Sequence, residues 1–165
     1  MTPTTVIGWR EWVGLPDLGA SWIKAKSDTG ARSSSLHAFD LEHFERDDAP
    51  WVRFEIHPWQ RSKADAVLAE APLADQRVVK SSSGKGQRRA VIRTTLALGG
   101  LRYPIDLTLT RRDEMGFRML LGREAMRRRV VVDPGSSYKL GRPPLEVRRS
   151  NRAPEEDDVL DEVGE

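Results

Sequence analysis

The sequence predicts an all-β protein with one or two short helices, and three observations support this fold class. Several segments are rich in β-branched and aromatic residues and alternate between apolar and polar positions, as strands do. Turn residues, mainly glycine and proline, separate these segments. Good helix formers occur together in only two short runs, so no long helix is expected.

The first two expected strands cover residues 6–13 and 22–26, and they flank a turn containing Gly14, Pro16 and Gly19. The next strand is expected at residues 51–56. There Val52, Phe54 and Ile56 alternate with more polar positions, which places one apolar face against a core.

The strongest strand pattern lies in the second half of the chain. Residues 89–98 are rich in β-branched side chains, and residues 101–110 alternate. Gly99-Gly100 between them predicts a tight hairpin turn. A last short strand is expected at 129–133, before a turn over the sequence PGSSY.

Short helices are predicted at 123–129, after Gly122, and within 62–75, where Pro72 would end the helix. From about Arg142 onward, proline pairs and blocks of charge predict a largely disordered segment. We therefore expect one domain over residues 1–145 and a disordered acidic tail over 146–165.

Composition limits the class of protein. The 165 residues are 38% hydrophobic and 32% charged, which suits one domain with a core of its own. Cysteine is absent, so disulfides, cysteine-based zinc sites and a cysteine nucleophile are excluded. The N-terminal residues do not resemble a signal peptide, and no apolar run is long enough to span a membrane. We expect a cytoplasmic protein without membrane contact.

The formal net charge of +2 conceals an uneven distribution. The last eleven residues hold seven acids and no base, so residues 1–154 keep 18 acids against 27 bases, a net charge of +9. A basic body favours an anionic partner such as nucleic acid, an acidic peptide or a ribosomal surface.

The stretch IKAKSDTGARSSSLHA, residues 23–38, brings Asp28, Thr29 and Gly30 to the end of an expected strand. An Asp-Thr-Gly tripeptide is a good Asx-type turn, and a turn alone would explain it. The alternative is a catalytic carboxylate held at a defined point, with Gly30 allowing another backbone to come close.

Two later features favour the catalytic interpretation. About ninety residues further on, FRMLLGREAM (117–126) runs through an apolar stretch into Gly122, Arg123 and a short helix. Between the two motifs, residues 77–95 form an expected hairpin whose tip, SSSGKG, is rich in glycine and serine.

These motifs, in this order, resemble the retropepsin-like aspartic proteases, and more closely the bacterial family labelled "ATP-dependent zinc protease" (RimK-associated, RimB-like). The resemblance covers about residues 6–140. It implies a closed β-barrel half-enzyme with a flap hairpin, acting as a C2 dimer. It also implies an aspartic endopeptidase in which Asp28 of each chain activates water, with Thr29 bracing both loops and Gly30 admitting the substrate. A single Asp28 per chain requires the homodimer, since Asp106, Asp113 and Asp133 lack the Asp-Thr-Gly context.

The resemblance also assigns supporting roles. Gly122 would pack behind the loop that carries Asp28, called the active loop below, and Arg123 would support that loop. The expected substrate-binding residues are Ala31, Arg32, Ser82, Ser83, Gly84, Lys85, Gly86, Arg88, Leu120 and Leu121. In viral members the arginine equivalent to Arg123 pairs with an acid shortly after the catalytic motif. Here that position is Arg32, so Arg123 needs another partner, for which Glu114 and Asp113 are candidates.

No cofactor and no metal site is expected. The histidines His37, His43 and His57 lack the spacing of a ligand cluster and are better explained as surface or supporting residues. The sequence SSSGKGQ lacks the pattern of a nucleotide-binding loop.

The charge pattern indicates the substrate class. Residues 77–104 contain seven bases and no acid, as a solvated hairpin or a groove selecting acidic peptides would. The family resemblance adds possible partners: ribosomal protein S6 carrying a glutamate tail, and a glutamate ligase. The acidic residues 155–165 could be a solubilising tail or compete for the basic groove.

Two other functions stay open. A non-catalytic basic β-barrel could bind RNA or a ribosomal surface, using tryptophans between its bases. A scaffold could also keep the fold without activity, although the intact Asp-Thr-Gly argues against this.

Overall fold

A computed structural model describes residues 5–59, 65–80, 84, 86–111 and 116–151. The strands are β1 (Thr5–Leu15), β2 (Ala20–Ser27), β3 (Ser34–His37), β4 (Phe39–Arg46), β5 (Ala49–Ile56), β6 (Val67–Pro72), β7 (Asp75–Lys80), β8 (Gly86–Leu98), β9 (Leu101–Thr110), β10 (Met119–Leu121) and β11 (Val130–Ser137). The helices are the 3-10 helix η1 (Pro16–Leu18), α1 (Arg123–Met126) and α2 (Leu145–Asn151). The predicted all-β class with short helices is confirmed.

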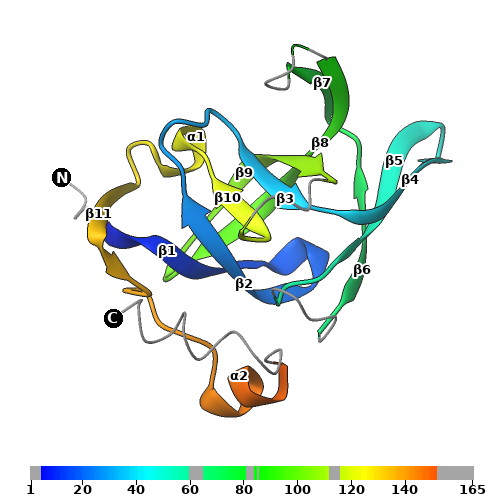
Figure 1. Cartoon of the computed structure of the whole chain (residues 1–165). Coiled ribbons are helices and arrows are strands. Elements are labelled where there is room, and N and C mark those ends of the chain that lie inside the picture. The colour runs from blue at the N-terminus through cyan, green and yellow to red at the C-terminus, as the bar shows by residue number, and fades with distance from the viewer. Residues whose placement is uncertain (1–4, 60–64, 81–83, 85, 112–115, 152–165) are drawn as a thin grey trace.

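The strands form two sheets (Figure 1). The larger sheet has eight strands in the order β11-β1-β2-β10-β3-β9-β8-β7, and β4-β5-β6 form a second sheet. Within the larger sheet β1 also pairs with β8, where Gly14 lies opposite Ala97. The sheet therefore curls back on itself into a partly closed barrel, with the β7–β8 hairpin projecting from it.

Most strands expected from alternation are present. β1, β2 and β5 cover the segments expected at 6–13, 22–26 and 51–56. β8 and β9 pair up to Leu98 opposite Leu101, so Gly99-Gly100 is the predicted hairpin turn. Gly99 has φ = 59°, a conformation that glycine adopts without steric cost.

The helix expected within residues 62–75 is wrong, because the described part of this segment contains strand β6. β6 pairs antiparallel with β5, so that Phe54 lies opposite Ala69. Ala69 and Ala71 face the core while Leu68 is exposed, which is the two-residue period of a strand. Burial against a neighbouring strand has overridden the helix propensity of alanine.

Two boundaries near the C-terminus also differ from expectation. β11 continues to Ser137 through the expected PGSSY turn, because it pairs in parallel with β1 around a bulge near Gly8. The segment after Arg142, expected to be disordered, contains helix α2. Residues 152–165, which include the acidic stretch, lie outside the described residues, so the tail hypothesis stays a prediction.

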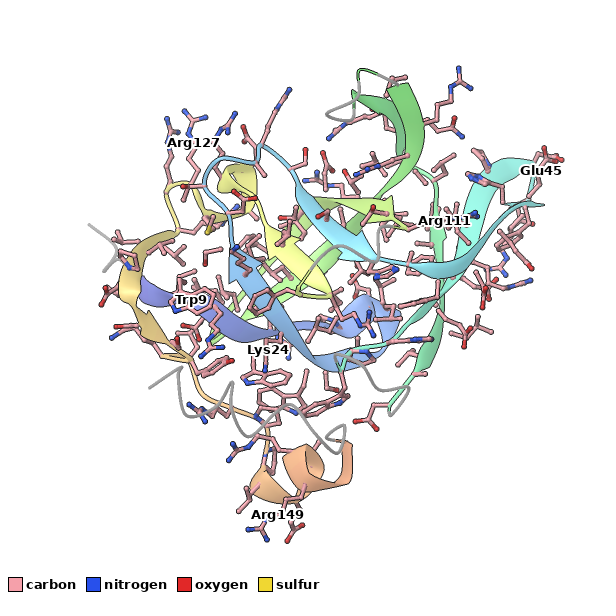
Figure 2. All side chains as sticks on the ribbon, viewed as in Figure 1. Trp9, Lys24, Glu45, Arg111, Arg127 and Arg149 are labelled. Atoms are coloured by element: carbon pink, nitrogen blue, oxygen red, sulfur yellow. The ribbon has the colours of Figure 1, made fainter. Side chains whose placement is uncertain are left out.

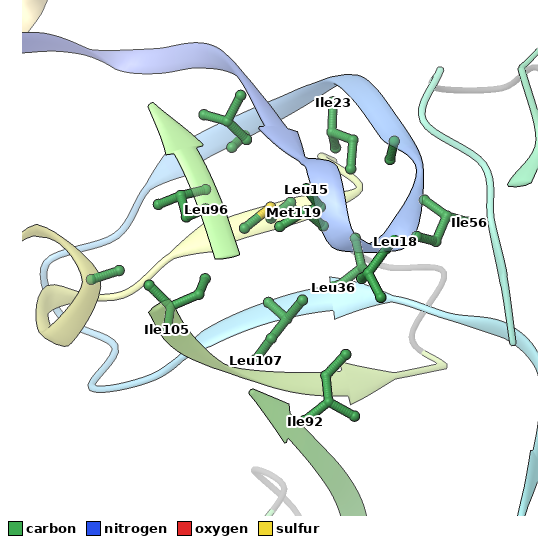
Figure 3. Close-up of a cluster of buried hydrophobic side chains, with 14 of the residues drawn as sticks. Leu15, Leu18, Ile23, Leu36, Ile56, Ile92, Leu96, Ile105, Leu107 and Met119 are labelled. Carbon is green, nitrogen blue, oxygen red and sulfur yellow. The ribbon is translucent and has the colours of Figure 1, made fainter. Parts of the chain in front are cut away.

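The main core lies between the strands that lead into the Asp28 loop and into Gly122 (Figure 3). Ile23 of β2, Leu36 of β3 and Met119 of β10 are all completely buried, as is Leu107 of β9. Burying an aliphatic side chain contributes about 1.5–3 kcal/mol. The core therefore fixes β2, β10 and β3 side by side at the point where their loops meet.

A second cluster holds the C-terminal segment against the barrel. Trp12, Trp59 and Tyr138 are buried together, and Val147 of α2 packs on them. The Nζ of Lys24 lies 5.1 Å from the Trp12 ring centre, a cation–π contact on the same side of the barrel as α2 (Figure 2). Trp12 and Trp59 therefore pack inside the fold.

Glu11 ties β1 to the segment after β11. Its side chain is completely buried, and Oε2 accepts hydrogen bonds from the backbone N–H groups of Gly8 (2.6 Å) and Lys139 (2.9 Å). Oε1 accepts from the N–H of Leu140 at 3.0 Å. One buried carboxylate thus satisfies three backbone donors, of which the Gly8 N–H is itself buried.

We predict that Glu11→Gln lowers the free energy of unfolding by about 1–3 kcal/mol. The amide keeps one acceptor but turns an NH₂ donor toward backbone N–H groups, whichever way it is oriented. Urea denaturation measures the change, and Glu45→Gln at the exposed tip of the second sheet is the control (Figure 2). Equal stability of the two variants would contradict this role for Glu11.

No helix in the described part of the chain is long and apolar enough to cross a membrane.

Candidate active site

Asp28 lies directly after β2, where β2 and β3 both meet β10, a strand that follows them by more than eighty residues along the chain. β10 pairs in parallel with β2, placing Leu121 beside Ser27, and antiparallel with β3, placing Leu120 beside Ser35. The Asp28 N–H donates to the Leu121 carbonyl at 2.8 Å, which continues the ladder by one residue. The end of a packed sheet therefore fixes the backbone that carries Asp28, whose side chain is half-buried.

The loop after Asp28 is an Asx-type turn. Oδ1 of Asp28 accepts hydrogen bonds from the N–H groups of Gly30 (3.1 Å) and Ala31 (3.2 Å). The Ala31 N–H also approaches the Asp28 carbonyl at 3.2 Å. The turn and the catalytic interpretations are compatible, because these bonds use Oδ1 and orient the carboxylate. Oδ2 accepts no hydrogen bond within the described residues.

Backbone hydrogen bonds fasten this loop to α1. The Arg123 N–H donates to the Ala31 carbonyl at 2.8 Å, and the Glu124 N–H to the Arg32 carbonyl at 3.1 Å. The Gly122 N–H donates to Ser34 Oγ at 3.0 Å, in a buried position. The start of α1 thus finds its acceptors in the active loop, which explains why a four-residue helix is stable here.

Gly122 allows this close approach. A Cβ at Gly122 would lie 2.5 Å from the backbone carbon of Ser33 and 2.8 Å from the Arg32 carbonyl oxygen. Both neighbours are main-chain atoms of the active loop, so no side-chain rotation could relieve the overlap. Gly122 therefore packs directly against the loop.

Arg123 supports the loop through carbonyl groups. Its Nη1 donates to the Gly30 carbonyl at 3.1 Å and approaches the Thr29 carbonyl at 3.5 Å. Asp113 and Glu114, the acids considered as its partners, lie outside the described residues. With Arg32 at the position of the expected acid, the Arg123 guanidinium binds backbone carbonyls of the loop.

The two leucines of β10 point to opposite faces. Leu121 is completely buried in the core, so the prediction that it lines a substrate subsite is wrong. Side chains alternate along a strand, and Met119 and Leu121 share the core face. Leu120 faces the other way and is partly exposed, so its role in substrate binding stays a prediction.

The expected flap corresponds to the β7–β8 hairpin, which pairs from Asp75 opposite Val91 to Lys80 opposite Gly86. At its tip, Ser82, Ser83 and Lys85 lie outside the described residues. Gly84 is exposed with φ = 82°, and Gly86 and Arg88 are exposed on β8. The hairpin is present, while closure over a substrate stays a prediction.

A basic hollow of about 240 Å³ lies beside the active loop. Its charged lining includes Arg32, Arg77, Arg93, Asp106 and Arg129. Arg77 and Arg93 belong to the seven bases of residues 77–104, whereas no local pattern in the sequence marks Arg129. Asp106 was considered only as a possible catalytic partner. The β8–β9 register places Arg93 directly opposite Asp106. The predicted Gly99-Gly100 turn fixes this register, so the sequence alone could have indicated that Arg93 and Asp106 lie side by side.

Tyr103 connects β9 to α1 at the edge of this hollow. Its hydroxyl donates to the Ala125 carbonyl at 2.5 Å, and the Arg129 guanidinium lies 3.9 Å from its ring centre. Burial raises the pKa of Tyr103, and the positive charge of Arg129 partly opposes that rise.

We predict that Tyr103→Phe lowers the free energy of unfolding at neutral pH by about 1 kcal/mol, through loss of this hydrogen bond. Because folding raises the Tyr103 pKa, its contribution is fully present below the unfolded pKa, about 10. That contribution is lost as the pH rises through the higher folded pKa. The gap between wild type and variant in urea denaturation should therefore shrink at alkaline pH, and a gap independent of pH would contradict this role.

The other acids considered beside Asp28 have their own contacts. Asp106 accepts from Arg93 Nη1 at 3.0 Å and from Arg77 Nη2 at 3.4 Å. Asp133 accepts from Ser136 Oγ at 2.7 Å and from the Gly135 N–H at 3.0 Å, and these bonds lower the Asp133 pKa. Asp113 lies outside the described residues.

The histidines do not fit a zinc site. His37 and His57 are buried and each stacks on Phe39, with ring centres 4.1 and 3.8 Å apart, while His43 is exposed. Within the described residues, no group of three or more histidine or acidic side chains could hold a metal ion. The zinc named in the family label therefore has no ligand set among them, and no chemical step is derived from it.

Most of this chain matches part of several longer proteins that are named as ligases. A protein from Parasynechococcus marenigrum (strain WH8102) named "Probable alpha-L-glutamate ligase" is 51% identical over 141 residues, which are 86% of this chain and 30% of that protein. A protein of the same name from Shewanella pealeana is 48% identical over 136 residues, 82% of this chain and 30% of its own length. The chain thus spans about a third of these relatives, whose names are those of ligases and not of zinc proteases.

A solved structure shares the fold. The crystal structure of a protein of unknown function from Legionella pneumophila subsp. pneumophila strain Philadelphia 1 matches with a TM-score of 0.70 and 28% identity, covering 84% of this chain and 99% of that one. The family model described as "RimB-like: Retropepsin-like aspartic endopeptidase RimB" matches residues 6–143. This match includes the Asp28 loop, the β7–β8 hairpin and α1. The chain therefore belongs to the RimB-like family of retropepsin-like aspartic endopeptidases.

Proposed function

We propose that this chain is an aspartic endopeptidase that acts as a C2 homodimer and hydrolyses peptide bonds with water activated by two copies of Asp28. The observation that carries the proposal is the Asp28 loop itself. It presents a half-buried carboxylate at the end of a packed sheet and is fastened to Gly122, Arg123 and Glu124 by hydrogen bonds. Membership of the retropepsin-like family supports the same chemistry.

The chemistry requires two carboxylates that share one proton. The ionised Asp28 takes a proton from water, and the oxygen attacks the peptide carbonyl carbon. The protonated Asp28 of the second chain donates its proton to the carbonyl oxygen, giving a tetrahedral diol. Collapse breaks the C–N bond, and the dyad returns a proton to the leaving amine. Thr29 and Gly30 would brace the two loops and admit the substrate backbone.

Acidic peptides are the substrates we propose, such as a glutamate tail on ribosomal protein S6. The basic lining beside the active loop and the bases along the β7–β8 hairpin support this, because complementary charge guides encounter and register. Ser82 to Gly86 and Arg88 would close over the peptide. The ligase names of the relatives support a glutamate ligase as a functional partner.

Binding of RNA by a non-catalytic barrel has less support. RNA binding without base pairing uses exposed aromatic rings between basic residues. Here Trp12 and Trp59 are buried with Tyr138, and Trp22 packs against this cluster.

Hydrolysis of a glutamate-rich peptide carrying a fluorophore and a quencher tests the function, with cleavage products identified by mass spectrometry. Activity per chain should rise with protein concentration and then level off, because only the dimer holds both carboxylates. Absence of internal cleavage at any concentration would contradict the peptidase. Constant activity per chain from a preparation that is monomeric by light scattering would contradict the dyad.

A further inference from the structure

The basic hollow beside the active loop is built from four parts of the fold. Arg32 comes from the loop after Asp28, Arg77 from β7, Arg93 from β8 and Arg129 from the turn after α1. In Figure 1 this loop, α1 and the β7–β8 hairpin lie toward the same end of the molecule. Arg32 is only four residues from Asp28, so a ligand in the hollow would sit close to the catalytic carboxylate.

The hollow carries excess positive charge. Its four arginines face two acids, Asp106 and Glu124, which leaves a net charge of +2 among the lining residues. Asp106 pairs with both Arg77 and Arg93, at 3.4 and 3.0 Å. Within the described part of the chain, Arg32 and Arg129 form no ion pair. Like charges placed this close repel one another, and an anion would remove the repulsion.

Contacts within the fold orient the guanidinium groups of Arg77 and Arg129 before any ligand arrives. Nη1 of Arg77 donates to Ser33 Oγ at 3.0 Å, which links the hairpin to the active loop. Arg129 rests 3.9 Å above the centre of the Tyr103 ring. A guanidinium stacked on a ring keeps its N–H edges available for a carboxylate, which it can bind through two parallel hydrogen bonds.

We propose that this four-arginine hollow is a subsite that binds an acidic side chain of the peptide substrate, with Arg32 and Arg129 as the principal carboxylate ligands. Arg93 and Arg77, shared with Asp106, shape the hollow and limit its net charge. The proposal rests on the proposed function for its substrate and adds the residues that select it. It also accounts for a basic residue at position 32.

The test compares two fluorogenic peptides of equal length, one with glutamates flanking the cleaved bond and one with glutamines. For Arg32→Gln and Arg129→Gln, we expect the ratio of kcat/KM for the two peptides to fall about tenfold or more each. Arg93→Gln, which removes a partner of Asp106, should lower the ratio by a smaller factor. Arg102→Gln and Arg127→Gln remove the same charge from exposed positions outside the hollow and should keep the ratio. Arg127 is labelled in Figure 2. Melting temperatures verify that all five variants are folded.

Three outcomes would overturn the proposal. The ratio could stay constant in all three hollow variants, or it could fall equally in the two control variants, which would indicate general charge attraction. Alternatively, single-stranded RNA could bind more tightly than the glutamate peptide and lose its affinity in the hollow variants.

A binding measurement separates this proposal from the proposed function. Fluorescence anisotropy of the labelled glutamate peptide is measured on the Asp28→Asn chain with and without each hollow substitution. If wild type cleaves no peptide but binding weakens about tenfold in the hollow variants, the peptidase fails and the acidic-peptide site stands. If wild type cleaves both peptides and the substitutions change neither binding nor the ratio, the peptidase stands and the subsite fails.

Discussion

Replacing Asp28 with asparagine is expected to abolish measurable peptide hydrolysis, with a loss in kcat of about a thousandfold to ten-thousandfold, the upper part of the range of general acid–base catalysis. An amide can neither take a proton from water nor give one to the substrate carbonyl. The fold should be unchanged, because the asparagine Oδ1 can still accept from Gly30 and Ala31 N–H groups as Asp28 does. Steady-state cleavage and circular dichroism measure the two effects.

Asp133→Asn is the matched control for this variant. Asp133 also uses Oδ1 to accept from the N–H two residues later, in Gly135, but it lies on β11 and outside the Asp-Thr-Gly motif. It should keep full activity, and equal loss in both variants would contradict a special role for Asp28.

Mixing the Asp28→Asn chain with wild type under subunit exchange probes the dyad directly. If both carboxylates are needed, activity falls with the square of the wild-type fraction. A linear fall would mean that each chain works alone.

Gly122→Ala is expected to have the second-largest effect, destabilising the fold by about 3 kcal/mol or more and removing activity. Overpacking generally costs about 1–3 kcal/mol, and the added Cβ here meets main-chain atoms of Ser33 at 2.5 and 2.6 Å. Relief of the overlap requires the active loop to move away from α1. That movement would break the bond from the Gly122 N–H to Ser34 Oγ and displace Asp28.

Urea denaturation and peptide cleavage measure this variant, and Gly100→Ala is its control. Nothing lies within 4 Å of a Cβ built at Gly100, in the β8–β9 turn. Gly100→Ala should stay close to wild type in both measurements. A stable and active Gly122→Ala protein would show that the loop and α1 need not approach this closely.

The contacts of Arg123 differ from the arginine–acid pair expected from the viral retropepsins. Arg123 donates to the Gly30 and Thr29 carbonyls, a role that does not need an acid at position 32. Because Arg123 does not need an acid at position 32, a basic residue can occupy that position, and the Arg32 side chain lines the hollow. We expect the replacement of the acid by arginine to accompany a preference for acidic substrates.

The sequence by itself determined the fold class and the motif. Alternation with a period of two is a local property, so β1, β2, β5, β8 and β9 could be predicted from neighbouring residues alone. The Asp28 tripeptide and the Gly122 segment were also visible, because each is contiguous along the chain.

Only the tertiary structure decided what long-range pairing controls. The segment of β6 has the composition of a helix, and it is a strand because β5 offers a partner and the core accepts Ala69 and Ala71. The acceptors for the first N–H groups of α1 are carbonyl and hydroxyl groups about ninety residues earlier, which no local pattern encodes. In the same way, the four arginines of the hollow come from separate elements, and only packing brings their charges together.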